Sequence, residues 1–405
     1  MSGPWLTFAG IGEDGTLSPA AQAAVAAAEA GFGGPPDPAP AGDRGGGGPR
    51  HLALAGIGAD RARPWPMPFA AAPLLAHRGR RVVALVSGDP FWHGAGGSIA
   101  AHVAPGEWVS LPALSTFQLA ANALGWRLED VICLGLHAAP FARLRPVLGR
   151  GQRVIALLRD GAAPAALAAW LAENGLADTD LTVMEALGGP RARIRTAPAQ
   201  GFALEAIGAP VAAALETRAA GLPRAAGLPD HMFAHDGQIT RAPMRAITLS
   251  ALAPRQGAHL WDIGAGSGSV SVEFCLAGGR ATAIEARADR AANARANAEA
   301  FGLAHRMAVV QGAAPGALTG LAPPDTVFAG GGFDMALWSA LRAICPPGTP
   351  VVANAVTVET ETLLAAVHAH SGGDLWRFDM AQAAPLGRMR GWAPMRPVVQ
   401  WRGRT

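Results

Sequence analysis

The segment from His259 to Ser271, HLWDIGAGSGSVS, constrains the fold more than any other part of the chain. A short apolar stretch leads into an acidic residue, Asp262, and then into glycines at 264, 266 and 268. This pattern predicts a strand, a tight loop and the start of a helix, because closely spaced glycines let the backbone turn and approach a ligand. The next apolar run, 281–284, ends at Glu285, about 20 residues on, as in a Rossmann-type unit.

The spacing of these glycines favours one nucleotide cofactor over another. The dinucleotide fingerprint is Gly-x-Gly-x-x-Gly without an acid on the preceding strand, whereas this chain has Gly-x-Gly-x-Gly after an aspartate. S-adenosylmethionine has no pyrophosphate, and requires close backbone approach, a partner for its ammonium group and an acid for its ribose. We therefore assign Asp262 to the ammonium group and Glu285 to the ribose. The predicted loop residues are Gly264, Ala265, Gly266, Ser267 and Gly268. A plain glycine turn is the alternative.

Composition and length limit the other possibilities. At 405 residues the chain can form two domains of ordinary size. Mean hydropathy is +0.21, yet we find no apolar run of the ~18 residues that span a membrane. The N-terminus has no basic segment, so we expect a cytoplasmic protein without a signal peptide. Cys133, Cys275 and Cys345 are far apart and form no Cys-x-x-Cys pair, which argues against disulfides and against a metal site.

Arginine supplies all the positive charge of a chain with a formal net charge of +3. Arg191, Arg193 and Arg195 alternate along an expected strand, and a second group, 388, 390 and 396, lies near the C-terminus. Guanidinium groups bind carboxylates and phosphates, but a solvated charged face is the simpler interpretation of either group. We expect neither nucleic acid nor a membrane as a partner, because the chain has no basic run with interleaved aromatic residues and no known reader motif.

Apolar stretches alternate with alanine-rich helical ones, which predicts α/β domains with largely parallel sheets. Two Gly-Leu-Pro sequences mark 217–229 as a linker between domains at 1–216 and 230–405. Residues 31–49 are predicted to form a low-complexity loop. The other expected strands are 6–9, 82–86, 131–134, 154–157, 181–186, 192–196 and 202–207, and the expected helices are 20–30, 115–124, 164–174 and 242–252.

Three segments of the first half carry a resemblance to a known family: LTFAGIGEDG from Leu6, VSGDPFWHGAGG from Val86 and PALSTFQLAAN from Pro112. In this order they resemble the tetrapyrrole methylase family, and within it the cobalamin-pathway members that methylate precorrin-6 at carbon 5. The resemblance covers about residues 1–215 and implies two α/β subdomains around a cofactor cleft. It places S-adenosylmethionine against Gly10, Gly12, Ser87, Gly88, Asp89, Pro90, Ser115 and Thr116. From the residues alone, the last two are equally consistent with a helix N-cap, and 87–90 with a capped turn.

The second half resembles the decarboxylating methyltransferases that act at carbon 15 of the same intermediate. The matching residues are GLPD from Gly227, Asp236-Gly237, Thr240-Arg241, RAITLS from Arg245 and the segment 261–271. The resemblance implies a Rossmann-like domain and adds Thr240 and Ala314 to the cofactor site. It departs from the family pattern at Ala313, where an acid near the adenine is usual.

Further residues of the second half are candidates for substrate and catalysis. Gly331 and Gly332 follow an expected strand and should open the substrate side of the pocket, while Arg388 and Arg390 can hold substrate carboxylates. The catalytic candidates are His231, His235, Asn354 and Glu359. We expect Asn354 and Glu359 to end a later strand, where catalytic groups of open α/β sheets collect. Exposed loop positions and strand-end capping are the simpler alternatives.

Together the two resemblances imply an enzyme with two S-adenosylmethionine sites that acts on a precorrin-type tetrapyrrole. It would methylate precorrin-6B at carbons 5 and 15 and decarboxylate the carbon 12 acetate, giving precorrin-8X. We also expect a homo-oligomer formed through the C-terminal domain. A cobalt-containing form of the substrate and another tetrapyrrole methylation are the alternatives. A nicotinamide oxidoreductase is disfavoured by the glycine spacing, and a non-catalytic scaffold by the two cofactor loops.

Overall fold

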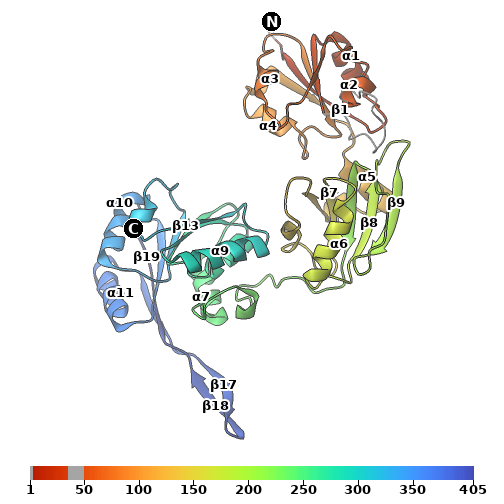
Figure 1. The fold of residues 1–405 in the computed structure, drawn as a ribbon. Helices are drawn as coiled ribbons and strands as arrows, with labels where there is room; N and C mark the ends of the chain where they lie inside the picture. The colour runs from red at the N-terminus through yellow and green to blue at the C-terminus, as the bar shows by residue number, and fades with distance from the viewer. Residues whose placement is uncertain (1–2, 35–49) are drawn as a thin grey trace. The chain divides into compact units, whose positions relative to one another are not determined.

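A computed structural model describes residues 3–34 and 50–405 of the chain. It divides into two compact units, coloured red to yellow-green and green to blue in Figure 1. Unit 1 comprises Met1–Phe141 and Val147–Gly221, and unit 2 comprises Ala142–Pro146 and Leu222–Thr405. The change from unit 1 to unit 2, between Gly221 and Leu222, lies within the first Gly-Leu-Pro sequence. No helix among the described residues is long and apolar enough to cross a membrane.

The first sheet of unit 1 has five parallel strands in the order β3-β2-β4-β1-β5. Its elements are β1 (Leu6–Ile11), α1 (Pro19–Ala27), β2 (Ala30–Gly33), α2 (Arg50–Leu54), β3 (Ala62–Pro64), α3 (Ala72–Leu75), β4 (Val82–Ser87), α4 (Gly96–Ala100), η1 (Pro105–Glu107) and β5 (Trp108–Leu111). The central strands are almost wholly apolar because both faces of the sheet are covered. Phe8 packs into one core cluster, and Ala9 and Ile11 pack into another.

The second sheet of unit 1 is mixed, with the order β6-β7-β10-β8-β9. Its elements are α5 (Thr116–Leu124), η2 (Leu128–Asp130), β6 (Val131–Gly135), η3 (Phe141–Leu144), β7 (Arg153–Leu158), α6 (Ala163–Glu173), β8 (Asp180–Glu185), β9 (Arg193–Pro198) and β10 (Val211–Glu216). Only β6 and β7 pair in parallel; the other neighbours are antiparallel. The central strand β10 is buried over Val211–Leu215.

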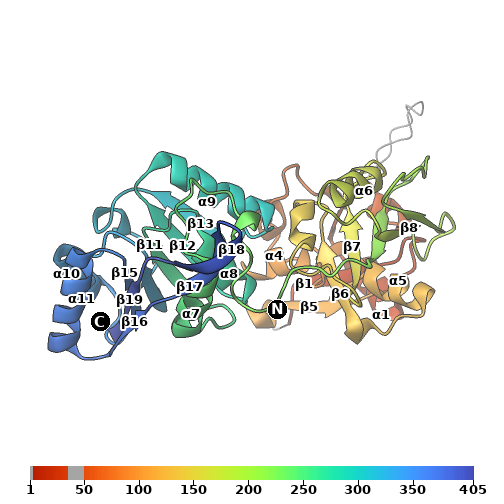
Figure 2. The ribbon, with the colours of Figure 1, turned by 90° about the horizontal axis from the view of Figure 1, so that it is seen from below.

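Unit 2 has a seven-stranded sheet in the order β13-β12-β11-β14-β15-β19-β16, whose first five strands are parallel. Its elements are η4 (Asp230–Met232), α7 (Ala242–Leu252), β11 (His259–Ile263), α8 (Ser269–Leu276), β12 (Arg280–Glu285), α9 (Ala288–Ala300), β13 (Met307–Gln311), η5 (Gly316–Leu318), β14 (Thr326–Ala329), α10 (Met335–Ile344), β15 (Pro350–Ala355), α11 (Val358–Ser371), β16 (Asp374–Phe378) and β19 (Val398–Arg404). Helices α7 to α9 cover one face, and α10 and α11 the other (Figure 2).

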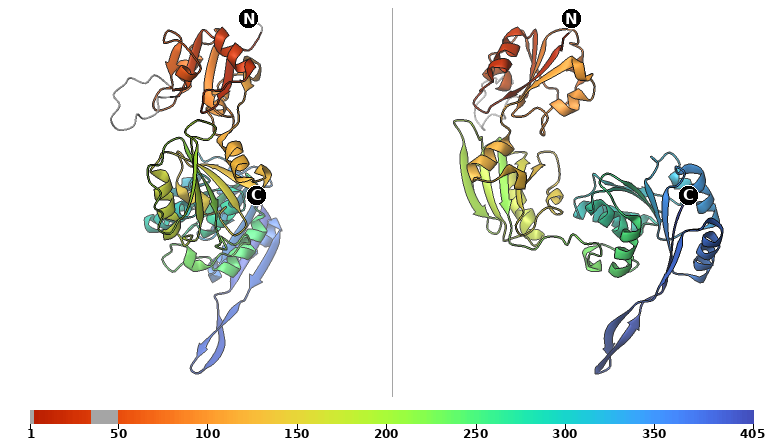
Figure 3. Two further views of the ribbon diagram at one scale, coloured as in Figure 1. Left: turned by 90° about the vertical axis from the view of Figure 1, so that its right-hand side faces the viewer. Right: turned by 180° about the vertical axis from the view of Figure 1, so that it is seen from behind.

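A two-stranded hairpin, β17 (Ala381–Leu386) and β18 (Met389–Pro394), extends from the rest of unit 2 (Figure 3). It pairs only with itself among the described strands. Its large apolar side chains are exposed to solvent: Leu386 by 69%, Met389 by 75% and Trp392 by 76%. An isolated hairpin is marginally stable in water, so this ribbon presents apolar surface that its own unit leaves uncovered.

Three sequence predictions for unit 1 are wrong. The helix expected over 20–30 ends at Ala27, because Ala30 already begins strand β2, and residues 31–33 of the expected loop also belong to that strand. Residues 35–49 lie outside the described residues. No strand forms over 202–207; the carbonyls of Glu205 and Ala206 accept hydrogen bonds from arginine side chains instead. The strand that completes the sheet is β10, whose uniformly apolar sequence lacks the alternation used to find strands.

Candidate active sites

The glycine loop of unit 2 joins β11 to α8, as the sequence predicts. Gly264, Gly266 and Gly268 all have positive φ angles of 57 to 69°, a region that side chains disfavour. A Cβ on Gly264 would come within 2.7 Å of the carbonyl oxygen of Gly331, so this glycine lets the loop after β14 approach. A Cβ on Gly266 would meet nothing within 4 Å. The backbone at Gly266 therefore faces open space that a ligand can enter.

Asp262 lies on β11 directly before this loop and is 1% exposed. Its Oδ2 accepts hydrogen bonds from the hydroxyl (2.6 Å) and the backbone N–H (3.2 Å) of Ser271, but its Oδ1 has no partner within the described part of the chain. Burial raises the pKa of Asp262 to about 6; the Ser271 hydrogen bonds lower it, and the charge of Glu285 raises it further. A buried acceptor without a partner is costly, so Oδ1 suits a donor on a bound ligand.

Glu285 ends β12, which pairs in parallel with β11, so both acids reach the same edge of the sheet. It is 6% exposed. Its Oε2 accepts from the N–H of Gly266 at 2.8 Å, and its Oε1 accepts from the N–H of Arg287 at 2.9 Å. Glu285 therefore holds the glycine loop, while each oxygen keeps lone-pair capacity for ligand hydroxyls.

The remaining cofactor and substrate candidates of unit 2 lie around this edge. Thr240 comes two residues before α7, and its carbonyl accepts from Arg245. Ala314 is half-buried after β13 and packs against the apolar cluster under α10. Gly331 and Gly332 are exposed after β14, and the first of them touches Gly264. The structure thus brings the glycine loop, the two acids and the loop after β14 together.

The four catalytic candidates are placed differently from one another. Asn354 is 8% exposed and donates to the Thr248 hydroxyl at 3.1 Å while accepting from Gln400 at 2.8 Å, so its polar atoms are used inside the fold. Glu359 does not end a strand, which corrects the prediction; it lies in the exposed first turn of α11. Of the two histidines, His231 is exposed in η4, and His235 accepts from the N–H of Gly237 through Nδ1.

The two arginine groups also separate. Arg388 and Arg390 are exposed on the β17–β18 hairpin. Arg193 and Arg195 instead both bond to Glu185 of β8, at 2.7 to 2.9 Å. Burial alone would raise the pKa of Glu185, but the hydrogen bonds from these arginines and from Gly208 hold it below its usual value. Arg193 and Arg195 therefore neutralise the buried carboxylate of Glu185 rather than forming an open charged face.

In unit 1, three predicted segments meet by direct backbone contact. A Cβ on Gly10, in β1, would overlap the carbonyl oxygen of Gly88 and the nitrogen of Ala113. Gly88 donates to the carbonyl of Ile11 at 3.1 Å and accepts from Ala113 at 3.2 Å. The ends of β1 and β4 and the entry to α5 are therefore packed together at one edge of the sheet, as a site built from all three requires. Gly12 follows β1 and is half-buried.

The polar side chains of this edge have protein partners. The Ser87 hydroxyl lies 3.0 Å from Nε2 of His51, and Asp89 accepts from the N–H of Phe91 at 2.8 Å. Ser115 is the N-cap of α5 and forms a capping box with Gln118, while Thr116 is the first helical residue. Pro90 is buried. Ser115 thus has the capping role that the sequence left as the alternative, and its hydroxyl proton is still available to a ligand.

Comparison with known proteins decides the family. A model of the tetrapyrrole (corrin/porphyrin) methylases matches residues 9–203, and a model of the precorrin methyltransferase domain matches residues 231–405. A protein of Sinorhizobium sp. named precorrin-6Y C(5,15)-methyltransferase (decarboxylating) is 43% identical over 411 residues, covering 98% of this chain and 96% of that protein. The chain belongs to the precorrin-6Y C(5,15)-methyltransferase family.

A second curated relative agrees with this membership. A protein of the same name from Mycobacterium tuberculosis (strain CDC 1551 / Oshkosh) is 39% identical over 83% of this chain and 86% of its own length. The solved C-terminal domain of precorrin-6Y C5,15-methyltransferase from Rhodobacter capsulatus is 59% identical, with a TM-score of 0.45, and covers 45% of this chain and 100% of that domain. Membership in these families confirms the resemblances of both halves and makes this precorrin-6Y methyltransferase homologue an S-adenosylmethionine-dependent enzyme.

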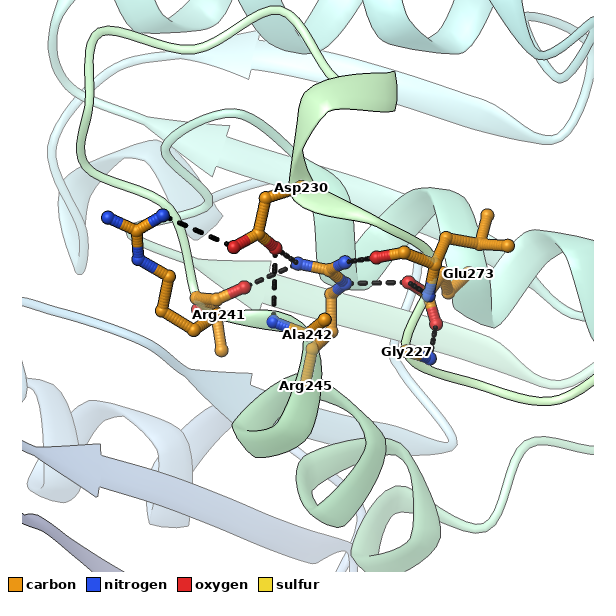
Figure 4. Close-up of polar contacts among 8 residues, drawn as sticks. Gly227, Asp230, Arg241, Ala242, Arg245 and Glu273 are labelled. Carbon is orange, nitrogen blue, oxygen red and sulfur yellow. Dashed lines mark hydrogen bonds and ion pairs between the residues drawn. The ribbon is translucent and has the colours of Figure 1, made fainter. Parts of the chain in front are cut away.

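Sequence reasoning missed a buried ionic network beside the second site. Arg245 of α7 is 0% exposed and bonds to Glu273 of α8 at 2.6 Å and to Asp230 at 3.1 Å (Figure 4). The ring of Phe233 lies 4.7 Å from its guanidinium carbon. A signal was present, because Glu273 is the one charged residue of the helix SVSVEFCL, and buried charges are kept only when paired.

Proposed function

We propose that this chain converts precorrin-6B into precorrin-8X, methylating carbons 5 and 15 and decarboxylating the carbon 12 acetate. The observation that carries the proposal is the match to the Sinorhizobium protein, whose name states both methylations and which spans 98% of this chain. A relative from Pyrobaculum calidifontis named as a probable cobalt-precorrin-6B C(15)-methyltransferase matches only 35% of it. Because relatives that contain both units are named for the precorrin reaction, we favour the metal-free substrate over the cobalt-containing one.

One S-adenosylmethionine is assigned to unit 2. The unpartnered Oδ1 of Asp262 suits the ammonium group, Glu285 suits the ribose, and the open space at Gly266 admits the ligand to the backbone. Thr240, Ala265, Ser267 and Ala314 complete this assignment on family resemblance. The residues present therefore fit the group, since the donors and acceptors that it needs are matched at one edge of the sheet.

A second S-adenosylmethionine is assigned to unit 1. Its supporting observation is the convergence of β1, β4 and the start of α5, which places Gly10, Gly88 and Ser115 side by side. Gly12, Ser87, Asp89, Pro90 and Thr116 belong to the same assignment. The glycines let these three segments meet, and the hydroxyl proton of Ser115, whose oxygen accepts from the Gln118 N–H, can be donated to a bound adenosine.

The chemistry requires placement more than reactive side chains. S-adenosylmethionine supplies a methyl group on a sulfonium, and the chain accelerates transfer to the ring carbon by aligning the two and excluding water. Three exposed apolar side chains follow β14 and β15 near Gly331 and Gly332: Met335, Val356 and Val358. We assign this apolar edge to the macrocycle in carbon 15 methylation. Decarboxylation also needs a proton source, for which His231 and His235 remain candidates.

Product analysis of separated units tests the division of labour. A fragment of residues 222–405 should take precorrin-6B and S-adenosylmethionine, release carbon dioxide and add one methyl group, at carbon 15. A fragment of residues 1–221 should then add the second methyl group, at carbon 5. Mass spectrometry identifies the products, with Asp262→Asn in the C-terminal fragment as the control. Methylation by the C-terminal fragment without decarboxylation, or decarboxylation by the N-terminal one, would show that the assignment is wrong.

The β17–β18 hairpin supports an oligomer formed through unit 2. Leu386, Met389 and Trp392 are exposed, and burying them against the same apolar residues of a second copy would be favourable. We therefore propose that copies of the chain associate through this ribbon. Sedimentation of the full chain should give more than one protomer, and Trp392→Glu should reduce it to a monomer, whereas Trp376→Glu, an equally large change at a 53% exposed residue of β16, should not.

We also infer a cytoplasmic location. Cys133, Cys275 and Cys345 are all free, which fits a reducing compartment. Cell fractionation followed by detection of the chain tests this inference, and recovery from the periplasm would contradict it.

A further inference from the structure

The segment Gly227–Arg241, which leads into α7, is fastened to the helices beside the glycine loop; we call it the strap. Arg245 donates to the carbonyls of Leu228 and Thr240, near the two ends of the strap. Glu273 accepts from the N–H groups of Gly227 and Leu228, at 2.6 and 2.9 Å (Figure 4). One buried ion pair therefore closes the strap into a loop, with Thr240, a proposed cofactor residue, at its far end.

The middle of the strap is tied to α9. Asn297, 2% exposed, accepts from the N–H of Ala234 at 2.8 Å and donates to its carbonyl at 2.9 Å. The same amide group donates to the carbonyl of Ser267 at 2.8 Å. Ser267 belongs to the glycine loop, so a single side chain joins the strap to the loop that we assign to S-adenosylmethionine. Arg290 adds an outer tie, to Asp236 at 2.8 Å and to Gln238 at 2.7 Å.

These contacts distinguish Asn297 from a residue that only stabilises the core. Arg245 and Glu273 link the strap to α7 and α8 but bond to no glycine-loop residue. Asn297 uses both polar atoms of its amide, and its two donor hydrogens serve two carbonyls on different segments. An ordered glycine loop therefore fixes the amide of Asn297, and a fixed amide holds Ala234.

We propose that Asn297 is a positioning residue that couples the strap to the glycine loop, so that cofactor binding at the loop also orders the strap. The proposal rests on the assignment of S-adenosylmethionine to the glycine loop of unit 2. Because the strap carries Thr240 as well as His231 and His235, binding of the methyl donor would also order these three candidate residues.

Hydrogen exchange of the full chain, with and without S-adenosylhomocysteine, tests the coupling. In the wild-type chain the ligand should slow exchange in peptides from both the strap and the glycine loop. Asn297→Asp keeps an acceptor for the Ala234 N–H but loses both donors. In this variant the ligand should slow exchange in the glycine loop alone. Its dissociation constant at unit 2 should rise about tenfold, the effect of losing the one buried hydrogen bond to the glycine loop, at Ser267.

Two further variants keep the test decisive. Asn293→Asp makes the same chemical change one turn earlier on α9, at a half-buried residue outside these bonds, and should behave as wild type. Asn297→Ala replaces the amide with a strong helix former and should lose the coupling too, which covers the case in which the aspartate variant does not fold. Strap protection that persists in a folded Asn297 variant would overturn the proposal. Absence of glycine-loop protection in the wild-type chain would instead contradict the cofactor assignment.

Discussion

Glycines in unit 1 bring chain segments together, whereas one glycine in unit 2 leaves room for a ligand. Gly10 is in contact with the backbone of Gly88 and Ala113, so no side chain fits there. Gly266 has no protein atom within 4 Å of the place where a Cβ would stand. We therefore expect Gly10 to contribute to its site by letting the segments meet, and Gly266 by leaving its backbone open to a ligand, although both belong to short glycine motifs at the end of a strand.

The acids of the two sites differ in the same way. In unit 2, Asp262 is buried with an oxygen that has no partner in the described chain. In unit 1, Asp89 is half-buried and closes its own turn by accepting from Phe91. Unit 2 therefore keeps polar capacity for a ligand in reserve, whereas the polar side chains of unit 1 are largely used to shape the loops.

The largest expected effect is a direct test of the two glycines. Gly10→Ala forces a Cβ against two backbones and should lower the free energy of unfolding by about 3 kcal/mol. Gly266→Ala meets only the cost of a positive φ, about 1 kcal/mol, yet should abolish S-adenosylhomocysteine binding in unit 2. Urea denaturation and calorimetry on the full chain measure the two effects. If Gly10→Ala and Gly266→Ala lowered the free energy of unfolding equally, the two glycines would not differ in how closely they are packed.

Replacing Glu285 should weaken the second site without unfolding it. Glu285→Ala removes the acceptor of the Gly266 and Arg287 N–H groups and, on our assignment, that of the ribose hydroxyls. We expect binding of S-adenosylhomocysteine to weaken by on the order of 1.5 to 3 kcal/mol, the range for hydrogen bonds to a charged group. Calorimetry measures it, with Glu299→Ala, an exposed position on α9, as the matched control. An unchanged dissociation constant would count against the ribose assignment.

Lowering the pH should separate folding from binding at Asp262. Its pKa of about 6 in the folded chain is above the ordinary value of an aspartate, 3.8, so the ionised carboxylate destabilises the fold above pH 6. This penalty, about 3 kcal/mol, is relieved as the pH falls through 6 towards 4. An ammonium group needs the ionised form, so ligand affinity should instead weaken up to about tenfold per pH unit below pH 6.

Calorimetry between pH 5 and 8 measures how the ligand affinity depends on pH. The isosteric variant Asp262→Asn should bind the ligand weakly, with an affinity that does not change with pH. If the wild-type affinity were constant over that range, Asp262 would not be the partner of the ammonium group.

The sequence predicted those features that one continuous segment determines. The strand, loop and helix around Asp262 depend on neighbours within a few residues and formed as expected. The cap at Ser115, which the sequence left open as an alternative, is equally local. The arginines at 193 and 195 were interpreted as an open face, because nothing local shows that Glu185 of another strand reaches both. Asn297 was missed for the same reason: it bonds to residues 63 and 30 positions away in the chain.

The smallest expected effect concerns the exposed hairpin arginines, Arg388 and Arg390. If they attract the carboxylates of the substrate, the Michaelis constant for precorrin-6B should rise with added salt, since exposed charges are screened over about 10 Å at 0.1 M. Arg388→Gln and Arg390→Gln should each raise this constant a few-fold at low salt and flatten its salt dependence, because an exposed ion pair contributes up to about 1 kcal/mol. Arg255→Gln removes the same charge from an exposed position between α7 and β11 and should leave the dependence unchanged. A salt-insensitive Michaelis constant would make the hairpin arginines ordinary surface charge, and the hairpin would then serve association between copies alone.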